Sequence, residues 1–267
     1  MGEKMRNAPV YFAIVQVRHN PVLQLGTYVA EIQEKMRRAG YPDFMRGATM
    51  VFNMTVPAQQ EAEKSVAPQV SQNERYLFSN LEKDSGFILE PTAVTFQTTS
   101  YDTFEPFLAE FLKGLGIVHD CVALGYSERL GLRYLDAVVP EGGERELDKY
   151  LVNEVLGLAR RLPDDTNVVM SFSETHIRRP AGNLLCRTII RNGPLGFPID
   201  MQPGPLVLKA RFASIEGVHA ILDTDASREG REPFDIAKAK AMLSELHGEV
   251  RMVFDVTATK HAFKAWE

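Results

Sequence analysis

The sequence predicts an α+β protein with antiparallel sheets, arranged as two tandem β-α-ββββ-α units. Apolar, β-branched segments of strand length outnumber helical ones, and several follow one another across short turns. Amphipathic helical segments follow the first strand and close each half. The element order of residues 1–120 then recurs in residues 121–267, which end in an extra short helix, although the residues themselves do not repeat.

The first half begins with a strand at 10–17, VYFAIVQV, which is apolar, aromatic and β-branched. A helix is expected in 24–40, because its apolar residues recur at steps of three and four: Leu25, Val29, Ile32 and Met36. The polar stretch 58–72 predicts a loop. Further strands are expected at 48–56, 75–81, 87–89 and 93–99. A second helix begins near 103, with a broad apolar face that includes Phe104, Phe107, Phe111 and Leu115.

The second half is expected to repeat this order. Its strands are predicted at 127–139, 167–177, 183–191, 205–215 and 218–222, and its helices at 147–162, 234–254 and 257–266. The same element order occurs in TATA-binding-protein-like and helix-grip folds. That similarity concerns architecture and implies no function. The two halves are therefore interpreted as units that either form separate domains or pack as one.

Composition narrows the class of protein. Of the 267 residues, 45% are hydrophobic and 24% are charged, as in ordinary globular proteins. The net charge of −5 is unfavourable for binding polyanions, and neither half is basic. Two cysteines cannot form a disulfide framework, and the chain begins without an apolar leader, so we expect a cytoplasmic protein. Since no apolar run approaches the ~20 residues of a membrane span, no membrane association is expected.

No catalytic or cofactor-binding signature is present, so the sequence predicts no cofactor and favours a non-enzymatic protein. The one weak metal-site candidate is Asp223 with Asp225, since paired carboxylates can bind a hard cation. The more ordinary interpretation is an aspartate-rich turn at a strand end.

Charge segregation gives the clearest local signal. Four arginines and no acid occur between residues 175 and 198: Arg178, Arg179, Arg187 and Arg191. Glu174, His176 and Arg178 alternate along one expected strand, so they share a face. We interpret the arginines, with His176 and Glu174, as a patch that binds an anion or a partner protein. The alternative is that acids of neighbouring elements pair with these arginines. On that interpretation, Glu174, His176 and Arg178 lie on the solvated face of an antiparallel strand whose start is buried through Val168, Met170 and Phe172.

Two further features concern buried and exposed side chains. The Gly- and Pro-rich segment 192–205 carries four apolar residues that either form a contact loop or fold back over the sheet: Leu195, Phe197, Ile199 and Met201. Arg133 stands in an apolar strand and predicts a buried ion pair. Asp136 cannot be its partner, because three residues along a strand separate opposite faces.

The chain resembles a sporadically distributed family of uncharacterised prokaryotic proteins of about this length. The resemblance rests on a T-x-Y-x-x-F-x-x-F pattern from Thr99 to Phe107 and on R-x-G-L-R-Y from Arg129 to Tyr134. It extends to the ending with Asp223, Asp225 and Trp266. The resemblance implies no catalytic residues. The patchy distribution of this family implies mobile genes such as toxin–antitoxin or phage-defence loci.

Three functional hypotheses follow. The first is a non-catalytic binding protein that acts through protein–protein contacts, such as an antitoxin, immunity or phage-defence accessory subunit. Its partner would be the product of a neighbouring gene or a second copy of the chain. The second is a small-ligand-binding protein or hydrolase with a cavity between sheet and helix, using Glu174, His176, Asp223 and Asp225. The third, disfavoured by the acidic charge, is a nucleic-acid binder.

Overall fold

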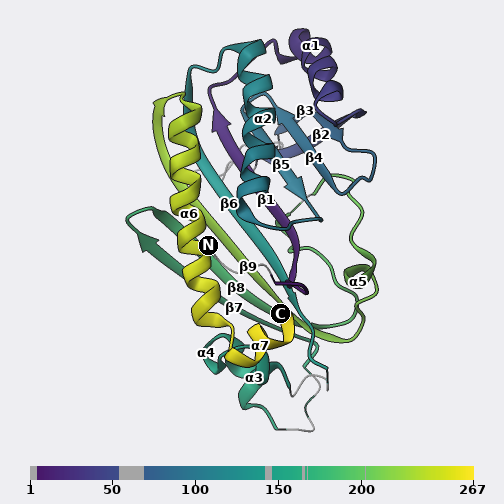
Figure 1. The fold of residues 1–267 in the computed structure, drawn as a ribbon, viewed down its shortest axis with the longest axis vertical. Coiled ribbons are helices and arrows are strands. Elements are labelled where there is room, and N and C mark those ends of the chain that lie inside the picture. Colours follow the sequence, from purple (N-terminus) through teal and green to yellow (C-terminus); the bar gives the residue numbers. More distant parts are fainter. Residues whose placement is uncertain (1–4, 54–68, 142–145, 164–165, 167, 202) are drawn as a thin grey trace, which may run out of the picture.

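The computed structural model describes residues 5–53, 69–141, 146–163, 166, 168–201 and 203–267. Nine strands occur in this part of the chain: β1 (Val10–His19), β2 (Asp43–Asn53), β3 (Gln69–Ser79), β4 (Ser85–Glu90), β5 (Ala93–Thr98), β6 (Tyr126–Val138), β7 (Met170–Arg179), β8 (Gly182–Asn192) and β9 (Val218–Pro233). They form one sheet in the order β2-β3-β4-β5-β1-β6-β9-β8-β7 (Figure 1). Every pairing is antiparallel, which confirms the predicted α+β fold with antiparallel strands.

The pairing of β1 with β6 joins the two halves of the chain. In its register, Ala13 lies opposite Tyr134 and Val15 opposite Leu132. The other strands of the first half extend from β1, and those of the second half extend from β6. The halves therefore contribute to one uninterrupted sheet.

Three long helices pack on one face of the sheet: α1 (Leu25–Arg38), α2 (Phe104–Val122) and α6 (Ile236–Thr257) (Figure 1). Each buries its apolar stripe against alternate strand residues, such as Val15 of β1, Phe96 of β5 and Leu132 of β6. None of the helices in the described ranges combines the length and apolar character needed to cross a bilayer.

The opposite face is partly covered by the segment 193–217, which includes the short helix α5 (Ala210–Ala213). The expectation of a strand at 205–215 is therefore wrong. The apolar side chains of this segment, including Leu206, Leu208 and Phe212, pack against the sheet instead of pairing at its edge. Periodicity alone could not distinguish these two ways of burying the same residues.

The helix expected at 147–162 is broken into α3 (Leu147–Tyr150), α4 (Asn153–Leu156) and the 3₁₀ helix η2 (Gly157–Arg161). Leu151 is extended and forms a β-bridge with Ala258, which stands between α6 and α7 (Lys260–Trp266). Gly157, at φ 59°, ends α4 in a conformation that favours glycine. Tertiary pairing at Leu151 thus overrides local helical periodicity.

Two strands are longer than expected. β9 continues to Pro233, well beyond the predicted end at 222, so Asp223 and Asp225 lie inside a strand and not in a turn. β3 begins at Gln69, within the predicted loop 58–72, of which residues 58–68 lie outside the described residues.

The close approach of α2 to β4 yields a test of the packing. A Cβ on Gly114 would lie 2.2 Å from the ring of Phe87, which is buried and has no room to move. Gly114→Ala is therefore expected to reduce the free energy of unfolding by about 1–3 kcal/mol, measured by urea denaturation. Gly248 on α6 has open space around it. Gly248→Ala should instead stabilise by roughly 0.5–1 kcal/mol, and equal effects of the two changes would contradict the packing argument.

Candidate functional site

Strand alternation sends the charged residues of β6 to opposite faces of the sheet. Arg133 points to the face that carries segment 193–217, whereas Tyr134 and Asp136 point toward the helices. The two charges therefore enter different environments. Arg133 forms ion pairs with acidic side chains. Oδ1 of Asp136, in contrast, has no hydrogen-bond partner among the described residues.

On the face that carries segment 193–217, five residues form an ion cluster: Arg133, Glu174, Arg187, Asp200 and Asp223. Arg133 donates from Nε and Nη2 to the two carboxylate oxygens of Asp223, at 2.6 and 2.7 Å. It also donates to Asp200, at 3.1 and 3.2 Å. The predicted ion pair of Arg133 is thus present, with Asp223 as its buried partner.

Arg187 completes the ion cluster. It donates to Glu174 at 2.8 Å, to Asp200 at 3.0 Å and to Asp223 at 3.3 Å. Burial alone would raise the pKa of Asp200, but hydrogen bonds from Arg133 and Arg187 lower it to about 2. The cluster therefore holds the exposed loop residue Asp200 against the sheet.

The four arginines of the predicted patch do not act alike. Arg187 belongs to the ion cluster, and Arg179 pairs with Glu249 of α6 at 2.9 Å. Within the described ranges, Arg178 and Arg191 make no ion pair. The alternative of internally paired arginines thus holds for two of the four, because acids distant in sequence approach them in the fold.

The polar residues expected to line a sheet–helix cavity lie elsewhere. Glu174 and Asp223 belong to the ion cluster, and His176 lies 2.8 Å from Glu174. Asp225 on the same face approaches Arg129 at 3.6 Å. Arginines thus neutralise both aspartates of the weak metal candidate, and the described residues contain no group of three or more potential metal ligands.

The predicted contact loop is mostly internal. Leu195, Phe197 and Met201 pack against the sheet, and the Phe197 ring lies 5.1 Å from that of Phe12. Only Ile199 is fully exposed. The alternative that these residues fold back over the sheet describes three of the four.

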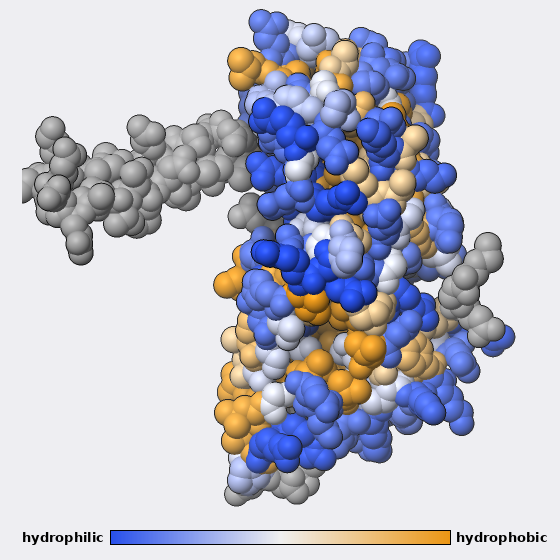
Figure 2. All heavy atoms as spheres, turned by 90° about the vertical axis from the view of Figure 1, so that its left-hand side faces the viewer, coloured by the Kyte–Doolittle hydropathy of each residue, from blue (hydrophilic) through white to orange (hydrophobic). Residues whose placement is uncertain are grey.

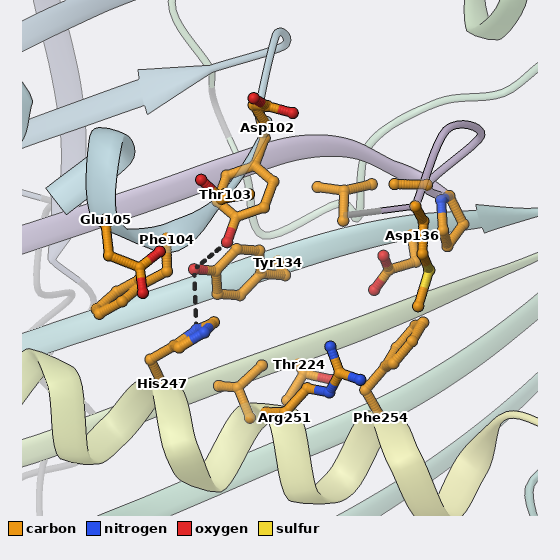
Figure 3. A pocket seen from close by; sticks show the side chains of 16 residues that line it. Asp102, Thr103, Phe104, Glu105, Tyr134, Asp136, Thr224, His247, Arg251 and Phe254 are labelled. Atoms are coloured by element: carbon orange, nitrogen blue, oxygen red, sulfur yellow. Dashed lines mark hydrogen bonds between the residues drawn. The ribbon is translucent and has the colours of Figure 1, made fainter. Parts of the chain in front are cut away.

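A pocket lies on the helix side, between β6, β9, α2 and α6, with a volume of about 180 Å³. We call it the helix-side pocket. Four aromatic side chains line it together with several polar and charged ones (Figure 3). The side chains that matter here are Tyr101, Phe104, Glu105, Tyr134, Asp136, Thr224, His247, Arg251 and Phe254.

Asp136 is the unusual group of the helix-side pocket. Its residue is 4% exposed, and its Oδ1 has no hydrogen-bond partner in the described part of the chain. Its carboxyl points toward Tyr134 and the middle of the pocket (Figure 3). Burial, with no counter-charge, raises the pKa of Asp136 to about 7. A buried polar group left without a partner is costly, so a group of this kind in a cavity is a candidate for a functional site.

Tyr134 connects the other polar groups of the pocket. Its hydroxyl lies 3.4 Å from both the hydroxyl of Tyr101 and Nδ1 of His247 (Figure 3). Burial lowers the pKa of His247 to about 4, so the imidazole is neutral near pH 7. This ring also stacks on Phe104, with centroids 3.9 Å apart. The three side chains form a fixed, uncharged wall beside Asp136.

Three more charged side chains line the pocket: Asp102, Glu105 and Arg251. Arg251 donates to Asp255 at 2.8 Å, on its own helix. Glu105, an exposed residue, stands in the first turn of α2, where a carboxylate offsets the positive end of the helix. Neither Glu105 nor Arg251 partners Asp136, so the pocket presents a buried acceptor among aromatic rings.

Sequence reasoning missed the helix-side pocket. In the sequence, Asp136 draws attention only as a possible partner for Arg133, which its spacing excludes. The three-residue spacing from Arg133 could nevertheless have pointed to Asp136. It places this acid on the face of β6 that packs against helices, where a buried carboxylate needs a partner from another element.

Comparison of the chain with known protein families, with characterised proteins and with solved structures finds no match. The function must therefore be argued from the geometry of the site.

The ion cluster yields a stability prediction. Asp223 is 1% exposed, so Arg133→Met would leave its carboxylate held only by Arg187, at 3.3 Å. We expect a loss of about 3–5 kcal/mol in urea denaturation. The double variant Arg133→Met/Asp223→Leu should recover most of this loss. The control Arg228→Met breaks an exposed pair with Glu245 and should cost less than about 1 kcal/mol. If Arg133→Met lowered the free energy of unfolding no more than the control does, the burial argument would be contradicted.

The raised pKa of Asp136 yields a pH prediction. The folded protein keeps a proton that the unfolded chain, near its ordinary value of 3.8, releases. Stability is therefore lost as the pH rises from about 4 to 7. Asp136→Asn avoids this loss, so its stability relative to the natural protein should increase from pH 5 to pH 8, by roughly 3 kcal/mol. Glu105→Gln serves as the control, and a pH-independent difference for Asp136→Asn would refute the prediction.

Proposed function

We propose that this protein binds a small organic ligand in the helix-side pocket. The observation that carries the proposal is the unpartnered, buried carboxyl of Asp136, aimed into a cavity of about 180 Å³. Ligand sites are typically concave and mostly apolar, with a few polar groups that fix orientation. Aromatic walls and one unsatisfied acceptor match this description.

The proposal differs from the leading expectation of protein–protein contacts and stays close to the alternative of a sheet–helix cavity. It changes the residues of that alternative, because Glu174, His176, Asp223 and Asp225 line the other face of the sheet. It also favours binding over hydrolysis. The hydroxyl that lies beside a base in the described lining is that of Tyr134, next to His247, and burial raises the pKa of Tyr134 well above its ordinary value, so it is a weak nucleophile.

The test is a small-molecule screen by thermal shift, followed by ligand-observed NMR. Ligands of the helix-side pocket should raise the Tm of the natural protein, and the shift should disappear in Asp136→Leu, which removes the acceptor and fills the space. Asp225→Asn changes a carboxyl of the neighbouring strand β9 on the opposite face, and should retain the shift. Shifts that survive Asp136→Leu would place the ligand elsewhere and contradict the proposal.

A second candidate function is the expected one, partner binding through protein–protein contacts. It is supported by apolar side chains gathered on the lower half of the side where β7 forms the sheet edge (Figure 2). Of the three residues expected to bury the start of this strand, Val168 is buried, whereas Met170 is 66% exposed and Phe172 52%. Ile199 and Arg178 are exposed as well. An antitoxin, immunity or defence accessory subunit would use this edge for the product of a neighbouring gene.

Co-expression with the products of the adjacent genes tests this second function. A true partner should co-purify in a fixed ratio with the natural chain, and Phe172→Ser with Ile199→Ser should weaken binding by at least about tenfold. Leu23→Ser removes an equally exposed apolar residue next to α1 and should have no effect. Equal weakening by the control would exclude the β7 edge.

We also infer that residues 1–120 and 121–267 follow one structural plan, although, in the described part of the chain, three strands and not four follow the first helical segment of the second half. In support, each half begins with a central strand, β1 or β6, and its last strand, β5 or β9, lies beside that strand. A long helix follows each last strand, α2 in the first half and α6 in the second. This plan places the helix-side pocket where the two closing helices flank β6.

A further inference from the structure

We infer that the ligand of the helix-side pocket carries a protonated amine, which binds Asp136 as its counter-ion. The inference rests on the proposed function and narrows it to a chemical class. Three features of the described residues support it: the unmet hydrogen-bonding capacity of Asp136, the charges around the pocket, and its aromatic walls.

The first feature is the hydrogen-bonding capacity of Asp136. An ionised carboxylate only accepts hydrogen bonds, whereas an ammonium group only donates them. An ammonium group placed at Oδ1 would supply the missing partner of this fully buried acceptor and would neutralise its charge. A ligand carboxylate or phosphate at the same position would meet a like charge or force Asp136 to stay protonated.

The second feature is the set of charges that face Asp136 from the surrounding elements. From α6 come His247, neutral near pH 7, and Arg251, which Asp255 holds. From α2 comes Glu105, and Asp102 stands just before that helix. Tyr134 of β6 and Tyr101 stay neutral, since burial raises the pKa of both, that of Tyr101 to about 12. The one side chain of the described lining that is positively charged near pH 7 is thus Arg251, which Asp255 holds.

The positive end of α2 does not reverse this balance. Figure 3 shows that Thr103 and Glu105 lie at the end of the pocket away from Asp136. Glu105 in the first turn offsets the helix dipole there. The end that contains Asp136 is therefore the one that would receive a cation.

The third feature is the aromatic wall. Tyr134 and Phe254 lie beside the space that the Asp136 carboxyl faces, and Tyr101 packs edge-on against Tyr134 (Figure 3). Ring faces attract ammonium groups and also bury an apolar body. A small amine attached to an aromatic or aliphatic body therefore fits both the charge and the walls.

The experiment compares three matched probes by isothermal titration and ligand-observed NMR: phenethylamine, the neutral 2-phenylethanol and the anionic phenylacetate. At pH 8 we expect the amine to bind at least about tenfold more tightly than the alcohol, and the anion to bind weakest. Between pH 8 and pH 6 the affinity for the amine should fall by about tenfold, because Asp136 becomes protonated while the amine keeps its charge.

Two variants locate the effect. Asp136→Asn should abolish both the preference for the amine and the pH dependence, while the alcohol should still bind. Asp225→Asn changes a carboxyl on the opposite face of the sheet, outside the pocket, and should change the affinity for the amine less than about threefold.

The outcomes separate this inference from the proposed function. If the alcohol and the amine bind equally, or if the preference survives Asp136→Asn, the inference is overturned and ligand binding in the pocket stands. Screening hits that need Asp136 but contain no basic nitrogen would also overturn the inference alone. If neither the probes nor any screened molecule binds in an Asp136-dependent way, both proposals fall.

Discussion

The antiparallel pairing of β1 with β6 is the constraint on which the rest of the structure depends. These two strands are the only contact through which backbone hydrogen bonds of the sheet pass from one half of the chain to the other within the described residues. Because they pair, the nine strands form one continuous sheet, and each face of this sheet contains residues from both halves of the chain. One face then belongs to α1, α2 and α6, and the other to segment 193–217.

The two faces of the shared sheet differ in whether their buried charges are paired. On the face that carries segment 193–217, Arg133 and Arg187 pair with Asp223, Asp200 and Glu174, so the buried carboxylate of Asp223 has cationic partners. On the helix side, Asp136 is buried without a match. The buried carboxylate of Asp223, on the neighbouring strand β9, is thus neutralised by an arginine, whereas that of Asp136 is not. A local departure from polar satisfaction of this kind is expected where a ligand supplies the missing partner.

Much of the fold was predictable from the sequence, and specific elements show why. β1, α1, α2 and α6 carry periodic apolar patterns strong enough to identify them, and the alternation along β6 suffices to place Arg133 and Asp136 on opposite faces. The failures have tertiary causes. Residues 205–215 bury apolar side chains on a sheet face without strand pairing, and 147–162 is interrupted where Leu151 bridges to Ala258. β9 runs beyond Leu222 because β6 and β8 pair with it on both sides, whatever its polar content.

Periodicity and composition, which are local, are enough to predict the fold class, the amphipathic helices, the buried pairing of Arg133 and the acid-free run of arginines. Long-range packing is needed to show which acids reach Arg179 and Arg187, that Leu195, Phe197 and Met201 turn inward, and that Asp136 faces a cavity. Each of these depends on contacts between residues far apart in the chain, such as Arg133 with Asp223 or Tyr134 with His247. A pattern read along one strand cannot specify what lies across from it, and the unpartnered state of Asp136 is a property of that surrounding space.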